Sequence, residues 1–175
     1  MSEKKIKGVL LKDSVVSDTK EAKDIYSQSR FGEQKEDKIV YSLVEAMYLL
    51  EKGKMNVVDN KNKKVNLDGF NKRARNIEKN FGVRYAVFKD LRGRGYIVKT
   101  ALKFGADFRV YDRGVKPGED HAKWIVYPVH ETEVMTMYEF SAKNRVAHST
   151  RKNLLLAVVD AELDVTYYLI SWIKP

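Results

Sequence analysis

Residues 107–129 read DFRVYDRGVKPGEDHAKWIVYPV and contain two apolar segments separated by a polar loop. In the first segment, residues 108–111, apolar and polar side chains alternate, which is typical of a β-strand with one buried face. The loop contains two glycines and a proline, which favour turns, and the apolar run 124–129 predicts a second strand. In this arrangement Tyr111, at a strand end, and His121, in the adjoining loop, can converge on one point.

A second polar segment, His148-Ser-Thr-Arg-Lys152, precedes another apolar run, LLLAVV. Lys152 therefore stands, like Tyr111, at the edge of a predicted strand and beside a polar loop. Strand edges are stiff positions from which loops present reactive groups. A tyrosine, a histidine and a lysine can together supply a proton acceptor, a proton donor and a fixed positive charge without a metal ion. This combination favours RNA strand cleavage.

The composition limits the class of protein. The 175 residues include 43% hydrophobic residues, enough for a core in one domain or two small ones. Lysine and arginine (33) exceed aspartate and glutamate (24), and the resulting net charge of +9 favours a polyanionic partner. The chain has no cysteine, which excludes disulfides and thiolate chemistry. It also lacks a signal-peptide core and any long apolar run, so we expect a soluble, cytoplasmic protein without membrane contact.

The spacing of apolar residues predicts both strands and helices in the first half of the chain. We expect strands over 6–16, a helix capped by Ser17, Asp18 or Thr19, a helix over 37–52 ended by Gly53, a strand and polar turn over 54–67, and an amphipathic helix over 67–81. The basic residues on this last helix, Lys72, Arg73, Arg75 and Lys79, are better explained by a solvated face than by RNA contact.

The pattern changes near Gly82, where we place a domain boundary, with domains over 1–80 and 81–175. A helix around Tyr85, Phe88 and Leu91 leads to a second half in which strands dominate. We expect these strands over 96–99, 107–111, 123–129, 153–159 and 164–173, with one helix over 136–147. The chain is therefore predicted to be an α/β (α+β) protein, with a small N-terminal α/β domain and a C-terminal mixed-sheet domain.

The three histidines differ in their surroundings. His121 lies in a loop rich in glycine and proline, beside Asp120, where no core would satisfy it. His130 precedes two glutamates and is interpreted as a surface residue. His148 is close enough to Lys152 for a supporting role, although a structural role is more common for such a histidine. Their spacing matches no metal-binding motif, and no phosphate-binding or nucleophile-elbow motif occurs, so neither a metal nor a cofactor is expected.

The segments KFGADFRVYDRG, DHAKWIVYPV and NRVAHSTRKNLLLAVVD resemble the archaeal tRNA-splicing endonuclease (tRNA-intron lyase) family, most strongly over residues 103–160. The resemblance implies a C-terminal nuclease-like domain that cuts precursor tRNA at bulge-helix-bulge junctions, leaving a 2′,3′-cyclic phosphate and a 5′-hydroxyl. It further implies a homotetramer, as in the short members of the family. The family's catalytic tyrosine, histidine and lysine fall on Tyr111, His121 and Lys152.

By this resemblance Tyr111 is the base, His121 the acid and Lys152 the electrostatic stabiliser of the transition state. A phenol ordinarily titrates at a pKa of about 10 and is a poor base at neutral pH. Two roles therefore stay open for Tyr111, proton acceptance and orientation of the 2′-hydroxyl.

Further positions are expected to bind RNA or a second subunit. Arg145 and Trp172 match places where family members hold a bulge base between cationic or planar side chains, although Trp172 is equally compatible with packing in the last strand. The acidic residues Asp160, Glu162 and Asp164 match a loop that inserts into a basic groove of a neighbouring subunit; a solvated hairpin tip is the simpler interpretation. The alternative function is a non-catalytic RNA-binding or structural subunit of the same complex.

Overall fold

The structure is a computed structural model that describes residues 4–102 and 105–175. Lys103 and Phe104, at the start of the stretch that resembles the endonuclease family, and residues 1–3 lie outside the described residues. The chain divides into two compact units, Met1–Phe81 and Gly82–Pro175. Each unit contains helices and one sheet, which confirms the predicted α+β class.

The N-terminal unit is built around a six-stranded sheet with the order β3-β4-β2-β1-β5-β6. Strands β1 and β5 are parallel, and the other neighbours are antiparallel. Its elements are β1 (Ile6–Leu10), β2 (Ser14–Ser17), α1 (Lys20–Ser29), β3 (Glu33–Lys35), β4 (Lys38–Ser42), α2 (Leu43–Glu51), β5 (Met55–Val58), β6 (Lys64–Val65) and α3 (Leu67–Ile77). Of the three candidate caps of the first helix, Thr19 is the N-cap, and its hydroxyl accepts a hydrogen bond from Ala22 N.

The prediction of a helix over 37–52 is wrong in its first part, because residues 38–42 form strand β4. Ile39 and Tyr41 are fully buried on one face of this strand. The four-residue spacing from Ile39 to Leu43 also fits the period of a helix, which is why the sequence predicted one here. The helix begins at Leu43 because Glu45 accepts hydrogen bonds from the backbone and side chain of Ser42, an arrangement that closes a helix start.

The amphipathic helix expected over 67–81 is shorter than predicted. Helix α3 ends at Ile77, and Phe81 already belongs to α4 (Phe81–Gly93). Phe70 and Ala74 are buried, whereas Leu67 and Ile77 at the two ends of the helix are partly exposed. The five apolar positions therefore belong to two consecutive helices.

The C-terminal unit contains a five-stranded sheet with the order β11-β10-β9-β8-β7. Strands β9 and β10 are parallel, and the other pairs are antiparallel. Besides α4, its elements are β7 (Ile97–Thr100), β8 (Phe108–Tyr111), β9 (Trp124–His130), α5 (Met137–Ser149), β10 (Asn153–Val159) and β11 (Val165–Ile170). The last strand, expected over 164–173, ends at Ile170, so Trp172 lies beyond it.

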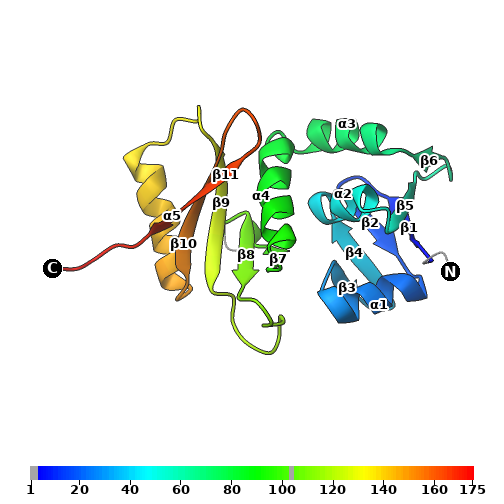
Figure 1. Cartoon of the computed structure of the whole chain (residues 1–175), viewed down its shortest axis with the longest axis horizontal. Coiled ribbons are helices and arrows are strands. Elements are labelled where there is room, and N and C mark those ends of the chain that lie inside the picture. Colours follow the sequence, from blue (N-terminus) through cyan, green and yellow to red (C-terminus); the bar gives the residue numbers. More distant parts are fainter. Residues whose placement is uncertain (1–3, 103–104) are drawn as a thin grey trace. The chain divides into compact units, whose positions relative to one another are not determined.

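Helices α4 and α5 cover opposite faces of this sheet (Figure 1). Phe108 of β8 faces α4, where its ring lies 6.0 Å from that of Phe88. Ile125 of β9 and Leu154 of β10 form a buried cluster with Ala147 of α5 on the other face. Arg109 pairs with Ile125 across the β8–β9 ladder and therefore lies on the α5 face, as does Tyr111 two residues later.

Candidate functional site

Three residues singled out from the sequence line one cavity of the C-terminal unit. The cavity has a volume of about 370 Å³ and contains Tyr111, His121 and Lys152 in its wall. The rest of the lining comprises Arg109, Gly118, Glu119, Asp120 and Ala122. We call this cavity the Tyr–His–Lys pocket. The end of β8, the following loop and the residue just before β10 all contribute to it.

Tyr111 is held by the sheet. It is the last residue of β8, pairs with Ile97 of β7 and is only 5% exposed. Arg109 shares its face of the strand, and the intervening Val110 is fully buried on the opposite face. A side chain packed in this way keeps one orientation, so the phenol is a fixed group of the pocket.

His121 lies in the exposed loop between β8 and β9, and this loop is tied at its base. Lys123 Nζ lies 2.8 Å from Asp112 Oδ2, and Lys123 N donates to Val110 O at 2.9 Å. The hydrogen bond from Lys123 is the main reason why the pKa of Asp112 lies below its usual range. These contacts join the two ends of the loop, which restricts where His121 can lie.

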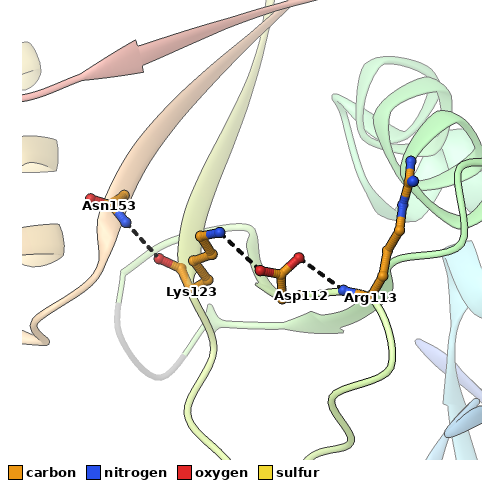
Figure 2. Close-up of polar contacts among 4 residues, drawn as sticks. All are labelled: Asp112, Arg113, Lys123 and Asn153. Atoms are coloured by element: carbon orange, nitrogen blue, oxygen red, sulfur yellow. Dashed lines mark hydrogen bonds and ion pairs between the residues drawn. The ribbon is translucent and has the colours of Figure 1, made fainter.

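Lys152 is connected to the same loop through its neighbour. Asn153 donates to Lys123 O both from its backbone N, at 3.0 Å, and from its side-chain Nδ2, at 3.4 Å. Figure 2 shows the resulting chain of contacts from Asn153 through Lys123 and Asp112 to the backbone N of Arg113. The segments at the end of β8, before β9 and at the start of β10 are thus linked directly beside the residues that line the pocket.

The ammonium group of Lys152 is oriented by the end of helix α5. Lys152 N donates to Ala147 O at 2.8 Å, and Nζ donates to Thr150 O at 3.0 Å. The preceding residue, Arg151, has a φ of 54°, a left-handed conformation that turns the chain from helix to strand. An ammonium has three donors, so the contact with Thr150 leaves two for an anion in the pocket.

A second cavity, of about 620 Å³, contains the two predicted RNA-binding residues, Arg145 and Trp172. It lies between α5 and the C-terminal tail and is lined by Phe140, Ser141, Asn144, Arg145, His148, Ser149, Ile170, Ser171 and Trp172. We call it the Arg–Trp pocket. The guanidinium of Arg145 lies 5.9 Å from the ring centre of Tyr138, and Trp172 is 52% exposed.

The remaining two histidines lie outside the Tyr–His–Lys pocket. The ring of His148 lies 4.5 Å from that of Trp172, so this histidine belongs to the Arg–Trp pocket rather than beside Lys152. Sequence reasoning missed this contact, because nothing in the spacing relates a helix end to a tail more than 20 residues later. His130 is a surface residue, and its Nδ1 lies 2.8 Å from Thr132 Oγ1.

The acidic turn, residues 160–164, joins β10 to β11. Asp160 Oδ1 accepts hydrogen bonds from Glu162 N and Asp164 N, both at 2.9 Å, so this carboxylate stabilises the turn itself. Glu162 and Asp164 are exposed, and so is Leu163, whose φ is 68°. The three acidic residues therefore differ, since two are available to a partner and one is engaged in the turn.

Residues 4–102 and 105–175 contain neither a cluster of metal-binding side chains nor a membrane-spanning helix. Among these residues there is no group of three or more histidine, aspartate or glutamate side chains able to hold a metal ion. Within the same ranges no helix has the length and apolar character needed to cross a membrane.

Comparison with known proteins identifies similarity over nearly the whole chain. Residues 6–70 match the family model described as "tRNA intron endonuclease, N-terminal domain", and residues 81–167 match "tRNA intron endonuclease, catalytic C-terminal domain". A tRNA-splicing endonuclease of Pyrococcus horikoshii is 42% identical over 172 residues, 98% of each chain. One from Thermococcus kodakarensis is 44% identical over 86% of this chain and 87% of its own. One from Nanoarchaeum equitans is 47% identical over 76% of this chain and 88% of its own.

Proposed function

Because the chain belongs to the tRNA intron endonuclease family and is an endonuclease of tRNA splicing, we propose that it excises introns from precursor tRNA at bulge-helix-bulge junctions in a metal-independent reaction. The observation that carries the proposal is the shared cavity of Tyr111, His121 and Lys152. These residues come from three separate segments of the chain, and they supply the three functions that cleavage by an RNA 2′-hydroxyl requires.

The proposed reaction is an in-line transesterification. The 2′-oxygen forms a bond to the adjacent phosphorus, and the bond from phosphorus to the 5′-oxygen of the next nucleotide breaks. Tyr111 accepts the 2′-hydroxyl proton or orients this hydroxyl, and His121 donates a proton to the departing 5′-oxygen. Lys152 stabilises the negative charge on the phosphorane-like transition state. The products are a 2′,3′-cyclic phosphate and a 5′-hydroxyl, and no water molecule is consumed.

The rigidity of the pocket supports a role in catalysis. Catalytic groups act efficiently when they are held in position before the substrate arrives. Tyr111 is fixed by the sheet, and the contacts of Lys123 with Asp112 and Asn153 connect the loop of His121 to the strand that follows Lys152. A non-catalytic RNA-binding subunit, the alternative function, would have no need for these three residue types in one braced cavity.

Cleavage of a bulge-helix-bulge RNA by the purified chain in the presence of EDTA tests the proposal. We expect cleavage at both junctions, with cyclic phosphate and 5′-hydroxyl ends identified by end-labelling. A matched RNA with 2′-deoxynucleotides at the two cleavage positions should bind equally well and stay intact. Cutting of the deoxy substrate would contradict 2′-hydroxyl attack, and binding without cutting of the all-ribose RNA would favour the non-catalytic alternative.

Metal dependence is decided in the same experiment. If EDTA abolishes the single-turnover rate and magnesium restores it, while probing shows an unchanged RNA fold, the metal-independent mechanism is wrong. The RNA control is essential because magnesium also stabilises folded RNA.

We assign the binding of a bulge base to the Arg–Trp pocket. Arg145, His148 and Trp172 present planar groups around one cavity, and Trp172 is half exposed. Unpaired RNA bases stack on aromatic rings and on guanidinium planes. An unpaired base of the bulge could therefore occupy the space beside Trp172 while the scissile phosphate lies in the Tyr–His–Lys pocket.

Assembly into a homotetramer is proposed on the basis of one edge strand and one turn. β11 is an edge strand with partly exposed apolar side chains, including Tyr168 and Leu169, and a second copy could pair with it. The exposed Glu162 and Asp164 could then contact a basic surface of another dimer. Two copies would provide two pockets for the two ends of an intron. We place this activity in the cytoplasm, together with its precursor tRNA substrate.

A further inference from the structure

Arg109 differs from other arginines whose Nε atoms are buried. The guanidinium of Arg30 lies over the ring of Tyr26 at 5.3 Å. Arg84 forms an ion pair with Asp107 at 2.8 Å. The buried Nε of Arg109, like that of Arg30, has no hydrogen-bond partner among residues 4–102 and 105–175. In contrast to Arg30 and Arg84, the side chain of Arg109 also has no ion pair or ring contact within these ranges.

The position of Arg109 places this unpaired cation in the Tyr–His–Lys pocket. It lines the cavity together with Tyr111, His121 and Lys152. It precedes Tyr111 by two residues in β8 and shares its face of the sheet, so both side chains come from the same stiff strand. Its backbone is fixed by pairing with Lys99 on one side and Ile125 on the other.

The two carboxylates of the pocket do not neutralise Arg109. Glu119 Oε2 accepts from Lys116 N at 3.3 Å, and Asp120 Oδ1 accepts from His121 N at 2.6 Å. Neither forms an ion pair with Arg109 within the described part of the chain. Burying part of a cation without a partner costs stability. An unpaired cation beside catalytic groups is therefore expected where an anion binds.

We propose that Arg109 is a further catalytic residue, whose guanidinium binds the non-bridging oxygens of the scissile phosphate opposite Lys152. The proposal rests on the function assigned to the pocket above. In-line attack increases the negative charge on these oxygens, and two cations stabilise that charge better than one. The planar guanidinium donates to two oxygens at once, whereas the lysine ammonium acts as a point charge.

The test compares Arg109→Met with Arg109→Lys and Arg113→Met. Methionine keeps much of the side-chain volume and removes the charge, and lysine restores the charge without the fork. Arg113→Met is the matched control, because it removes the same charge two residues after Tyr111 at a side chain that lies over the ring of Tyr96 and outside the pocket lining. Single-turnover cleavage should fall about 10²–10³-fold in Arg109→Met, recover partly in Arg109→Lys and stay within about threefold in Arg113→Met.

Thermal unfolding separates this role from a structural one. If Arg109 serves the substrate, removing this unpaired and partly buried cation should leave the Tm unchanged or raise it while the cleavage rate falls. A lowered Tm with a proportionate loss of activity would overturn the proposal in favour of a structural arginine.

A phosphorothioate at the scissile phosphate tests the contact directly. For one of the two diastereomers, replacement of the non-bridging oxygen by sulfur should slow the wild type more than it slows Arg109→Met, because the variant has already lost that contact. Equal effects of sulfur in both proteins, with either diastereomer, would show that Arg109 does not touch the phosphate.

Inorganic phosphate gives a readout that does not depend on cleavage. Titration should shift the NMR signals of the His121 ring in the wild type and in Arg113→Met, and it should require about tenfold more phosphate in Arg109→Met. Should the wild type fail to cut RNA, the proposed function fails while this titration still decides whether Arg109 binds the anion. Should the wild type cut normally and Arg109→Met behave like it in both assays, the Arg109 proposal alone is wrong.

Discussion

The Tyr–His–Lys pocket and the Arg–Trp pocket lie in the same unit and are both bordered by residues adjoining helix α5, but they hold their functional side chains differently. In the first, the phenol of Tyr111 is buried in the sheet and the loop of His121 is tied by the Lys123–Asp112 ion pair. In the second, Trp172 belongs to a tail beyond the last strand, and its ring lies 4.5 Å from that of His148.

This difference corresponds to the two roles proposed for the pockets, catalysis in the first and base binding in the second. Proton transfer and charge stabilisation depend on the positions of atoms to within a fraction of an ångström. Stacking on a base is less demanding, because every base has a π-face and the contact is spread over a whole ring rather than over single atoms. We therefore expect substitutions in the Tyr–His–Lys pocket to change the cleavage rate and substitutions in the Arg–Trp pocket to change affinity.

The largest effect is expected for His121→Ala. Loss of a positioned general acid should reduce the single-turnover rate about 10²–10⁴-fold, while binding to 2′-deoxy RNA changes little. His130→Ala is the control, since that histidine is bonded to Thr132 on the surface, away from the pocket. Equal rates for the two variants would remove His121 from the proposed mechanism.

Lys152→Ala is expected to have the next largest effect, roughly 10²-fold or more on the rate, which is typical of losing one preorganised charge. Lys152→Arg should recover part of the activity, because the guanidinium keeps the charge but cannot repeat the contact of Nζ with Thr150 O. A variant with normal rate at saturating RNA and much weaker affinity would move Lys152 into the class of residues that only bind.

The Tyr–His–Lys pocket was more predictable from the sequence than the Arg–Trp pocket, for physical reasons. Tyr111 is the last residue of β8, and Lys152 directly precedes β10. Both strands pair with β9, one antiparallel and one parallel, so the end of β8 and the start of β10 lie at the same edge of the sheet. The contact between His148 and Trp172 depends on the path of a tail after its strand ends, and local spacing does not determine that path. The strand at residues 38–42 was missed because a four-residue step between Ile39 and Leu43 satisfies a helix as well.

Arg109 illustrates a different limit. In the sequence it is the polar member of an alternating strand, and the ordinary expectation for such a residue is a solvated side chain. Only the structure shows that its Nε is buried, lacks a partner within the described ranges and lines the pocket. Asp160 is the opposite case, because a residue predicted for a subunit interface is bonded to the backbone of its own turn.

Trp172→Ala should affect affinity rather than rate. Stacking of one base contributes about 1–3 kcal/mol, so the variant should bind RNA roughly tenfold or more weakly and cleave at a nearly normal rate when saturated. Ile173→Ala is the matched control, since it removes an 83% exposed apolar side chain from the next position without removing a planar ring. Equal losses in both variants would indicate assembly rather than base stacking, and a rate defect in Trp172→Ala would break the distinction between the two pockets.

Substitutions in the acidic turn, residues 160–164, test whether pockets of different copies act together. Glu162→Gln combined with Asp164→Asn removes two exposed charges and keeps Asp160, whose carboxylate holds the turn. We expect light scattering to show a weaker tetramer, and high salt should weaken the wild-type tetramer in the same direction. The corresponding change of Asp160 to Asn should instead lower the Tm. An unaltered tetramer in the double variant would identify the turn as a solvated hairpin tip, and a monomeric wild type that cuts both junctions would contradict the need for two pockets.

The smallest effect is expected for the ion pair between Asp112 and Lys123, which joins the two ends of the loop that carries His121. Both side chains are nearly half exposed, so solvent and salt screen their attraction and the loss should be only about two- to fivefold in rate. Asp112→Asn and Lys123→Gln should each slow cleavage to this extent without weakening RNA binding, and the double variant should be no slower than the worse single one.

The sign of the pH dependence follows from the pKa of Asp112, which is held below its usual range chiefly by the hydrogen bond from Lys123. The ion pair therefore stabilises the loop fully above the ordinary pKa of an aspartate, and this stabilisation is lost as the pH falls through the lowered pKa of Asp112. The cleavage rates of the variants should accordingly be compared at neutral pH. Exchanging the two charges, Asp112→Lys with Lys123→Asp, should restore part of the rate if the pair acts by positioning the loop. Additive losses in the double variant and no recovery in the exchanged pair would mean that Lys123 contacts RNA itself, and the rigid framework assigned to the Tyr–His–Lys pocket would then depend on the bonds of Asn153 to Lys123 O alone.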